Sequence, residues 1–516
     1  MHRRLQLWEA IVRLLADASP SEQGCFCLLR EGRGLRGRRL LAVDPIFPPS
    51  DAWETQGTGH LRPTARWVSA AVSAAVSSGA GLLFVHSHPD PAHPPELSLL
   101  DETAVHALAE TLAPMLEGPF AAVVTHSAGW SGMIWDDVGL VPIDRVVSVG
   151  RILRPLSPRI VGRIAEGDEA LDARQADALG DVHSRLRDLE VAVVGSGGLG
   201  SPLAEQIVRM GVAGVTLVDH DVLDTPSNVR RVFGSTAADL RGTTPPAKVD
   251  VVGRHLDQFG LAPPVRRVRG DIRQEQVFRA LLDADVVISC TDTHGSRAVV
   301  NDLPSTCMLP VVDMGVRVGS KANGALVALA AEVRVLTPTT PCLWCRKAIS
   351  ADVARAENLP AHERQKLERE GYLVGGVGDP APSVVALTVL GAGLGACALL
   401  TLLSEEGDVA PCGYIVDGFL AYAMETQPTQ PVEGCRCRKK LGLGDFFTTV
   451  PPGSYLLSRR TVSAPGQRFL GIRARRIGRP SRRSGSECGR DRTRARSGAR
   501  LPRSGWPRAL AGRAPR

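Results

Sequence analysis

The stretch EVAVVGSGGLGSPLAEQIVRMGVAGVTLVDHD, residues 190–221, decides the fold of the larger part of the chain. It has the pattern of a buried strand, a glycine-rich turn, an amphipathic helix and a second apolar strand. Such units form parallel sheets that helices cover on both faces. Glycines between a strand and a helix let backbone N–H groups approach a phosphate at the positive end of the helix. The stretch therefore predicts a doubly wound, nucleotide-binding α/β domain.

Polar residues after this unit indicate which nucleotide chemistry to expect. Asp219 ends the second strand, where a carboxylate can accept hydrogen bonds from ribose hydroxyls. The glycine turn alone fits a nicotinamide-dependent oxidoreductase equally well. Nucleotidyl transfer needs cations at the phosphates and a carboxylate for Mg²⁺, whereas hydride transfer needs neither. Candidates for those tasks are Asn228, Arg231, Lys248 and Asp292, and the glycines of the turn are Gly195, Gly197, Gly198 and Gly200.

The order of these motifs resembles the ThiF, MoeB and ubiquitin-activating superfamily over residues 173 to 440. The matching pattern begins with Arg174-Gln175, continues through the glycine turn and Ser227-Asn228, and ends with Pro380-Ala-Pro. The resemblance implies a Rossmann-like domain that binds ATP and Mg²⁺. It also implies adenylation of the C-terminal glycine of a ubiquitin-like or sulfur-carrier protein that ends in Gly-Gly.

The resemblance assigns a role to each polar residue. Asp219 would hold the ribose and Asp292 the Mg²⁺, and Arg174 would reach the ATP of a second copy, so a homodimer is expected. The residues at the phosphates would be Asn228, Arg231 and Lys248, of which Arg231 and Lys248, with Asp292, would be catalytic. Taken singly, Arg231 or Lys248 could equally be a solvated helix residue, and Asp292 could cap the helix that follows it.

Two cysteine pairs in the same region have the spacing of metal ligands. Cys342-Leu-Trp-Cys345 is a metal knuckle, and Cys435-Arg-Cys437 lies far downstream. Four thiolates on Zn²⁺ would attach the C-terminal segment to the domain. The resembling family has CxxC twice, whereas the second pair here is CxC, so a structural zinc site and four unliganded thiols both stay open. Many relatives carry a thioester-forming cysteine after the first knuckle, and this chain has none between residues 346 and 383, so no thioester is predicted.

A second candidate site lies in VHSHPDPAHPPELSLLD, residues 85–101. His86 and His88 are two residues apart on an expected strand, so both side chains point to one face. Asp101 begins the next helix and can reach the same metal. Two imidazoles and one carboxylate leave Zn²⁺ a fourth position for water, which is typical of a catalytic site. The alternative is an ordinary helix start, because Ser98-x-x-Asp101 is also a capping-box pattern.

These residues complete the motif of the JAMM/MPN metalloprotease family, which the first 145 residues resemble. The motif is a glutamate, then H-x-H-P, then S-x-x-D, and Glu22 is the glutamate just before the first expected strand. The resemblance implies an α/β domain that hydrolyses peptide or isopeptide bonds after the C-terminal glycine of ubiquitin-like tags. It makes His86, His88 and Asp101 zinc ligands, Glu22 the general base and Ser98 the support of the oxyanion.

Together the two resemblances predict a bifunctional protein of a prokaryotic ubiquitin-like system, which activates a carrier and cleaves after its terminal glycine. The alternatives are sulfur-carrier activation and processing in cofactor or cysteine biosynthesis, and a non-catalytic scaffold. A conjugating enzyme would be a further partner in the first case and a sulfurtransferase in the second. The expected boundaries are residues 1–150 for the hydrolase, 151–172 for a linker, 173–450 for the adenylation domain and 451–516 for a tail.

Composition bears on location and on other partners. Residues 467–516 contain 16 arginines and two acids, so the net charge of +7 comes from this tail, and the rest of the chain carries −7. A nucleic-acid partner is therefore not expected, and the tail is expected to be disordered. The 11 cysteines without a signal-peptide pattern predict a cytoplasmic protein with reduced thiols. The uncharged stretch 384–403 predicts a helix buried in the domain rather than a membrane span.

Overall fold

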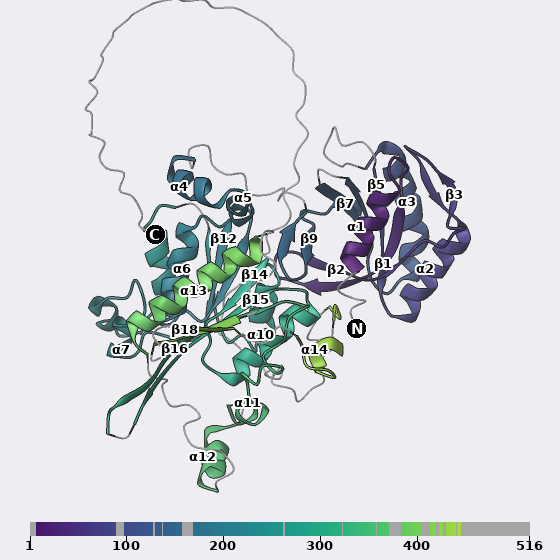
Figure 1. Cartoon of the computed structure of the whole chain (residues 1–516). Coiled ribbons are helices and arrows are strands. Elements are labelled where there is room, and N and C mark those ends of the chain that lie inside the picture. Colours follow the sequence, from purple (N-terminus) through teal and green to yellow (C-terminus); the bar gives the residue numbers. More distant parts are fainter. Residues whose placement is uncertain are drawn as a thin grey trace, which may run out of the picture. The chain divides into compact units, whose positions relative to one another are not determined.

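The computed structural model contains two large β-sheets, one in the N-terminal part of the chain and one in the part that follows (Figure 1). The expected tail and the Pro380-Ala-Pro motif lie outside the described residues. The structure describes residues 7–88, 97–126, 129–136, 138–156, 169–261, 264–321, 323–357, 359–370, 383–404, 413–418, 423–426, 430–439 and 441–444.

The N-terminal sheet has six strands in the order β2-β1-β5-β6-β7-β8. Neighbouring strands are antiparallel except for β5 and β6, which are parallel and are joined by a helix. The strands predicted from the sequence in this region are all present, because each alternates or concentrates apolar residues between turns. The bounds are β1 (Gly24–Arg33), β2 (Arg38–Ile46), β5 (Gly81–Ser87), β6 (Phe120–His126), β7 (Gly129–Asp136) and β8 (Gly139–Pro142).

Helices cover both faces of this sheet. On one face, α2 (Ala65–Ser77) and α3 (Leu99–Leu112) bury an aromatic core in which the rings of Phe26 and Trp67 meet edge to face, 4.8 Å apart. On the other face, α1 (Leu7–Asp17) packs its apolar side against β1 and β5. Side chains alternate along β5, so Phe84 and His86 share the face that α3 covers. This alternation brings the histidines to the start of α3.

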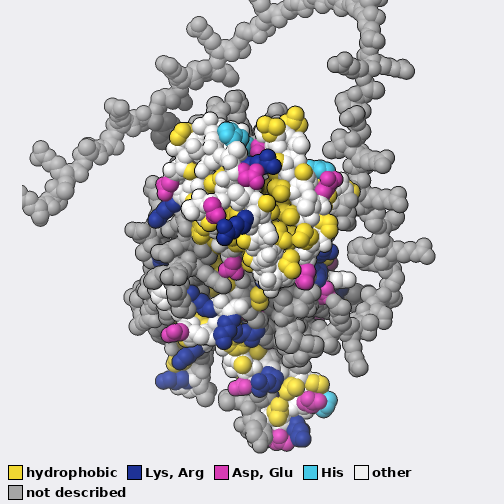
Figure 2. All heavy atoms as spheres, turned by 90° about the vertical axis from the view of Figure 1, so that its right-hand side faces the viewer, with side chains coloured by type: hydrophobic (Ala, Val, Ile, Leu, Met, Phe, Trp, Pro, Cys, Tyr) yellow, Lys and Arg dark blue, Asp and Glu magenta, His cyan; other side chains and the backbone are white. Residues whose placement is uncertain are grey.

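Smaller elements complete this region. A separate hairpin pairs β3 (Trp53–Gln56) with β4 (Leu61–Pro63), and a second pairs β9 (Val147–Val149) with β10 (Leu153–Pro155). The stretch expected to be a linker, 151–172, therefore contains a strand as well as the start of α4 (Glu169–Leu179). On the face of the molecule shown in Figure 2, hydrophobic side chains form groups among scattered acidic and basic ones.

The second sheet has eight strands in the order β13-β12-β11-β14-β15-β16-β17-β18. The first five run parallel and the last four pair antiparallel, with β15 belonging to both groups. This Rossmann-like arrangement confirms the doubly wound fold that the sequence predicts. The bounds are β11 (Glu190–Val194), β12 (Gly214–Asp219), β13 (Val265–Arg269), β14 (Val286–Ser289), β15 (Val311–Ser320), β16 (Leu326–Leu336), β17 (Gly413–Asp417) and β18 (Ala423–Thr426).

Two apolar layers enclose the parallel strands. One face packs against α6 (Gly200–Arg209), α8 (Lys248–Asp257) and α13 (Val385–Leu403), and the other against α9 (Glu275–Leu281) and α10 (His294–Thr306). The chain winds outward in opposite directions from β11 and β14, which lie side by side. Ligands bind at such a switch point, beyond the carboxyl ends of the strands. The remaining helices are α5 (Asp181–Arg187), α7 (Pro226–Val229), α11 (Ala351–Glu357), α12 (Ala361–Arg369), α14 (Arg436–Lys439) and the 3-10 turns η1 (Ala113–Met115) and η2 (Ala237–Leu240).

Helix α13 is the uncharged stretch that the sequence assigns to the core. Of the helices in the described residues, it alone is long and apolar enough to cross a membrane, and half of that window is buried in the protein. Its glycines allow close packing, because a Cβ at Gly395 would lie 2.3 Å from the sulfur of Met314. The expectation of a helix buried all round is wrong for one side, where Val385 is 46% and Val389 39% exposed.

Candidate functional site

The two histidines and the aspartate predicted as zinc ligands meet where β5 ends and α3 begins. The Nε2 atoms of His86 and His88 lie 3.2 Å apart. The carboxylate of Asp101 lies 3.5 Å from the first and 3.2 Å from the second. Three potential ligand atoms thus converge on one point, within 4.8 Å of one another. The geometry expected from the sequence is present.

The start of α3 fixes the orientation of Asp101. The hydroxyl of Ser98 accepts a hydrogen bond from the Asp101 N–H at 3.1 Å, and the Asp101 carboxylate accepts one from the Ser98 N–H at 2.8 Å. This is the capping box weighed above as the alternative to a metal site. The capping box is present and does not exclude a metal site, since the carboxylate that caps the helix also faces the imidazoles. The Ser98 hydroxyl itself donates to Asp101 at 2.5 Å.

Electrostatics at this cluster suit a cation. Burial raises the pKa of Asp101, but hydrogen bonds from His86, His88 and Ser98 outweigh it and hold that pKa far below its usual range. The hydrogen bond to Asp101 raises the pKa of His88. The His86 Nδ1 atom is buried without a hydrogen-bond partner in the described residues. Two imidazole nitrogens and one carboxylate form a donor set that fits Zn²⁺ with one open position.

Glu22 is buried beside this cluster, with 5% of its surface exposed. Its pKa is raised to about 7, chiefly by burial; the charge of His88 opposes this rise and that of Asp101 adds to it. A carboxyl group with a pKa near neutrality is matched to accepting and returning a proton at physiological pH. The choice of Glu22 as base therefore agrees with its environment.

The glycine turn after β11 is built so that only glycine fits at two positions. Gly195 has φ = 95°, which favours glycine, and a Cβ there would lie 2.8 Å from the Cys290 carbonyl oxygen. A Cβ at Gly200 would lie 1.7 Å from the Gly195 oxygen. The turn is thus closed tightly against the segment after β14, and α6 begins at its last glycine. Gly197 and Gly198 complete the same turn.

Asp219 supports the turn from the end of β12. One carboxylate oxygen accepts from the Ser196 N–H at 2.7 Å and the other from the Asp221 N–H at 2.9 Å. Burial raises its pKa, although these bonds and Lys248 oppose the shift. The assignment of Asp219 to a ribose stays a prediction, and holding the turn is a role that the sequence does not reveal.

Two of the predicted phosphate ligands lie against the turn. The Cβ position of Gly198 is 3.4 Å from Arg231, whose guanidinium donates to the buried Asn228 amide oxygen at 2.8 Å. The Arg231 Nε atom is buried and has no partner in the described residues. Lys248 begins α8 and pairs with Asp221 at 2.6 Å. A buried guanidinium donor without an acceptor indicates a place for an anion.

Asp292 and Arg174, the two other predicted ATP-site residues, are both exposed. Asp292 is exposed three residues after β14, at the carboxyl edge next to β11. Arg174 is exposed on α4. The position of Asp292 fits a magnesium carboxylate at the switch point. The assignment of Arg174 to a second copy stays a prediction.

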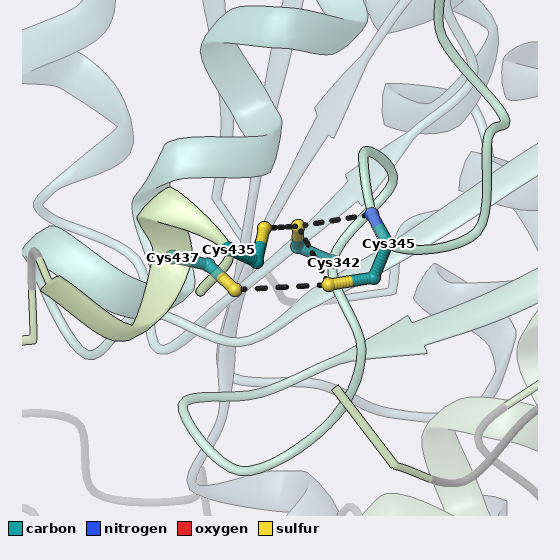
Figure 3. A group of neighbouring side chains, drawn as sticks. All are labelled: Cys342, Cys345, Cys435 and Cys437. Carbon is teal, nitrogen blue, oxygen red and sulfur yellow. Dashed lines mark hydrogen bonds between the residues drawn. The ribbon is translucent and has the colours of Figure 1, made fainter. Parts of the chain in front are cut away.

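The four cysteines of the two knuckles form one cluster (Figure 3). The sulfur of Cys342 lies 3.6 Å from those of Cys345 and Cys435, and Cys345 lies 3.9 Å from Cys437. A zinc–sulfur distance of about 2.3 Å places the corners of a tetrahedron about 3.8 Å apart. The separations therefore fit four thiolates on one Zn²⁺. The shorter CxC spacing brings both of its sulfurs into the cluster, just as the CxxC spacing does.

The cluster already stabilises negative charge at one sulfur. The hydrogen bond from the Cys437 thiol, together with those from Cys345 and Cys435, lowers the pKa of Cys342 to about 5 against the effect of burial. Burial raises the pKa of Cys435 to about 11. A divalent ion would displace the remaining protons, because thiolates are its ligands. Of the other cysteines, Cys290 is partly buried beside the glycine turn, and burial raises its pKa.

Sequence reasoning missed the residues that hold Glu22. Gln56 at the end of β3 and Gly57 after it bind the Glu22 backbone, and Ser87, between the two histidines, binds the backbone of the next residue, Gln23. Ser87 lies between the two predicted ligands His86 and His88, and this position could have indicated a role at the site. No pattern points to Gln56, because its contact with Glu22 spans 34 residues of sequence.

Comparison with known proteins identifies the second region. The ThiF family model matches residues 173–437. The chain is 28% identical over 161 residues to the sulfur carrier protein ThiS adenylyltransferase of Bacillus subtilis, covering 31% of this chain and 44% of that protein. It is 26% identical over 172 residues to the SAMP-activating enzyme E1 of Haloferax volcanii, covering 31% and 54%. It is 25% identical over 285 residues to ubiquitin-like modifier-activating enzyme 5 of Oryza sativa subsp. japonica, covering 52% and 62%. In each case the match spans less than two thirds of the relative.

Proposed function

The chain belongs to the ThiF family, and from this premise we propose that it uses ATP to adenylate the C-terminal glycine of a ubiquitin-like or sulfur-carrier protein. The observation that carries the proposal is half-buried Arg231 packed against the glycine turn, with its buried Nε atom unpartnered in the described residues. The names of the relatives agree, since they are adenylyltransferases or activating enzymes of such carriers.

The residues around the turn have separate tasks in this reaction. The carrier carboxylate attacks the α-phosphorus of ATP, an oxygen–phosphorus bond forms, and pyrophosphate leaves with the electrons of the broken bond. Backbone N–H groups of the turn and Arg231 would stabilise the charge on the phosphoryl oxygens. Lys248 would exchange its contact with Asp221 for a phosphate oxygen. Asp292 would hold Mg²⁺, which would supply positive charge against the charge that develops on the phosphates.

Exchange of labelled pyrophosphate into ATP tests this activity. Exchange is expected only when a carrier with a free Gly-Gly end is added, because the carboxylate must be present for the reverse reaction. The Asp292→Asn variant should lose exchange. Absence of exchange with every Gly-Gly carrier of the source organism would contradict the proposal, and exchange without a carrier would indicate a different acceptor.

We further propose a zinc-dependent hydrolase in the N-terminal region that cleaves peptide or isopeptide bonds after the same kind of glycine. The supporting observation is the convergence of His86, His88 and Asp101 beside a buried Glu22. Zinc would supply a bound water of lowered pKa. Glu22 would accept the proton of that water and return it to the leaving amine, and the Ser98 hydroxyl would support the oxyanion.

Cleavage of a carrier fused through its terminal glycine to a second protein tests the hydrolase. Zinc-loaded protein should release the second protein, and the His88→Ala variant should not. An uncleaved fusion with one zinc bound at the N-terminal region would contradict this activity and leave the adenylation proposal untouched.

The two activities share one substrate end, so we propose a cytoplasmic bifunctional protein of a prokaryotic ubiquitin-like system. Processing of a sulfur carrier in cofactor or cysteine biosynthesis is the second candidate, favoured by the ThiS relative. A conjugating enzyme or a sulfurtransferase would be the respective partner. A non-catalytic scaffold is the third candidate, and a chain that binds the carrier but shows neither exchange nor cleavage would favour it. The homodimer through Arg174 belongs to the same proposal, and sedimentation tests it.

A further inference from the structure

The β1–β5 ladder ends in an unusual way next to Glu22. Gly24 is paired with His86 in the regular antiparallel register. One residue beyond, the Ser87 N–H donates to the Gln23 oxygen at 2.8 Å, but the Gln23 N–H donates to the Ser87 hydroxyl at 3.1 Å. A side chain thus takes the place of a main-chain acceptor. Since Ser87 is buried, loss of its hydroxyl would leave the Gln23 N–H without that acceptor.

The other side of Glu22 is held by the β3–β4 hairpin. The Glu22 N–H donates to the Gly57 oxygen at 2.7 Å, and the Gln56 side-chain amide donates to the Glu22 oxygen at 2.9 Å. Both main-chain polar groups of Glu22 are therefore occupied by residues of a two-stranded element that belongs to neither large sheet.

We propose that Ser87 and Gln56 are positioning residues: Gln56 binds the Glu22 backbone and Ser87 binds the adjacent Gln23 backbone, and together they hold Glu22 beside the cluster of His86, His88 and Asp101. The inference rests on the proposed hydrolase activity. Ser87 lies between the two histidines and fixes the segment of the base to the strand of the ligands. Gln56 fixes the same segment to the hairpin. A general base must lie within hydrogen-bond reach of the water it deprotonates, so a small shift of this backbone lowers the rate of the chemical step.

Three variants test the proposal on the full chain with zinc bound. Ser87→Ala removes the acceptor, Ser87→Thr keeps it, and Gln56→Met keeps the length of the side chain but removes the donor. The probe is a fluorogenic peptide that ends in Gly-Gly joined to aminomethylcoumarin. We expect kcat to fall about tenfold in S87A and Q56M, with KM and zinc content unchanged. S87T should stay within about twofold of the unsubstituted chain, because its hydroxyl can accept the same bond.

A wild-type kcat in both S87A and Q56M would overturn the proposal, and so would a fall of the same size in S87T. Hydrogen exchange of the segment that contains residues 20–30 gives a readout independent of catalysis. The amides of Glu22 and Gln23 should exchange slowly in the unsubstituted chain and faster in S87A. If the unsubstituted chain does not cleave the peptide, the proposed hydrolase activity is contradicted. Unchanged hydrogen exchange of these amides in S87A would then contradict the positioning role as well.

Discussion

The two candidate metal clusters of this chain differ in the number of ligand atoms that they offer and in the distance between their residues along the sequence. The cysteine cluster offers four sulfurs at the spacing of a closed tetrahedron, from residues up to 95 positions apart. The histidine cluster offers three donors within 16 residues and keeps one position open. A closed set supports structure, whereas an open set beside a buried acid supports catalysis. The number of ligand atoms and the presence of a buried acid nearby thus distinguish an expected structural site from an expected catalytic one.

The largest effect is expected from breaking the closed cluster. Cys345→Ser should lose one zinc per chain and lower the free energy of unfolding by several kcal/mol, because folding and metal binding are linked. Zinc analysis and thermal unfolding measure both. The matched control is Cys397→Ser, an exposed cysteine outside the cluster, which should change neither quantity. Unchanged zinc content in the Cys345 variant would contradict the structural site.

Removal of the base at the open cluster should abolish hydrolysis without loss of metal. Glu22→Gln is expected to lower kcat by roughly 10²–10⁴-fold, since a general base contributes about that much. Cleavage of a Gly-Gly fusion and zinc analysis of the same sample give the result. Glu31→Gln is the control, as Glu31 lies on β1, the strand that follows Glu22, and binds Arg33 and Arg38 instead. Undiminished cleavage in the Glu22 variant would place the base elsewhere.

The phosphate contacts should give an intermediate effect in the other half of the chain. Lys248→Ala is expected to slow pyrophosphate exchange by roughly 10²-fold while leaving hydrolysis unchanged, because one preorganised donor is worth about that much. Arg254→Ala, on the same helix and paired with Asp239, is the control for exchange. Equal loss in both variants would indicate a general effect of charge on α8.

The smallest effect concerns the metal-free open cluster. The pKa of Glu22 is raised from its usual 4.5 to about 7 in the folded state, so its contribution to stability is complete below pH 4.5 and is lost as the pH rises through 7. Between pH 5.5 and 7.5 the loss should be about 2 kcal/mol. Urea unfolding in EDTA measures it, and the E22Q variant should lack this part of the pH dependence. The same slope in both proteins would contradict the raised pKa.

Local patterns allowed much of the fold to be predicted from the sequence. The strand, turn and helix of residues 190–221 follow from periodicity and glycine placement, and the ligands of both clusters from spacing. The exposed side of α13 could not be predicted, because a helix with apolar residues all round does not indicate which side is covered. The contacts of Gln56 with Glu22 could not either, since a hydrogen bond to a main-chain oxygen requires no particular sequence at its acceptor.

The separation of Cys342 and Cys435 also affects how the protein is made. On the ribosome, the second pair of sulfurs is synthesised 90 residues after Cys345, which takes roughly 5–20 s at ordinary rates of translation. During that interval the first pair can bind zinc only with outside ligands. The histidine cluster is complete long before, once Asp101 has emerged. Newly made chains would therefore complete the histidine cluster before the cysteine cluster.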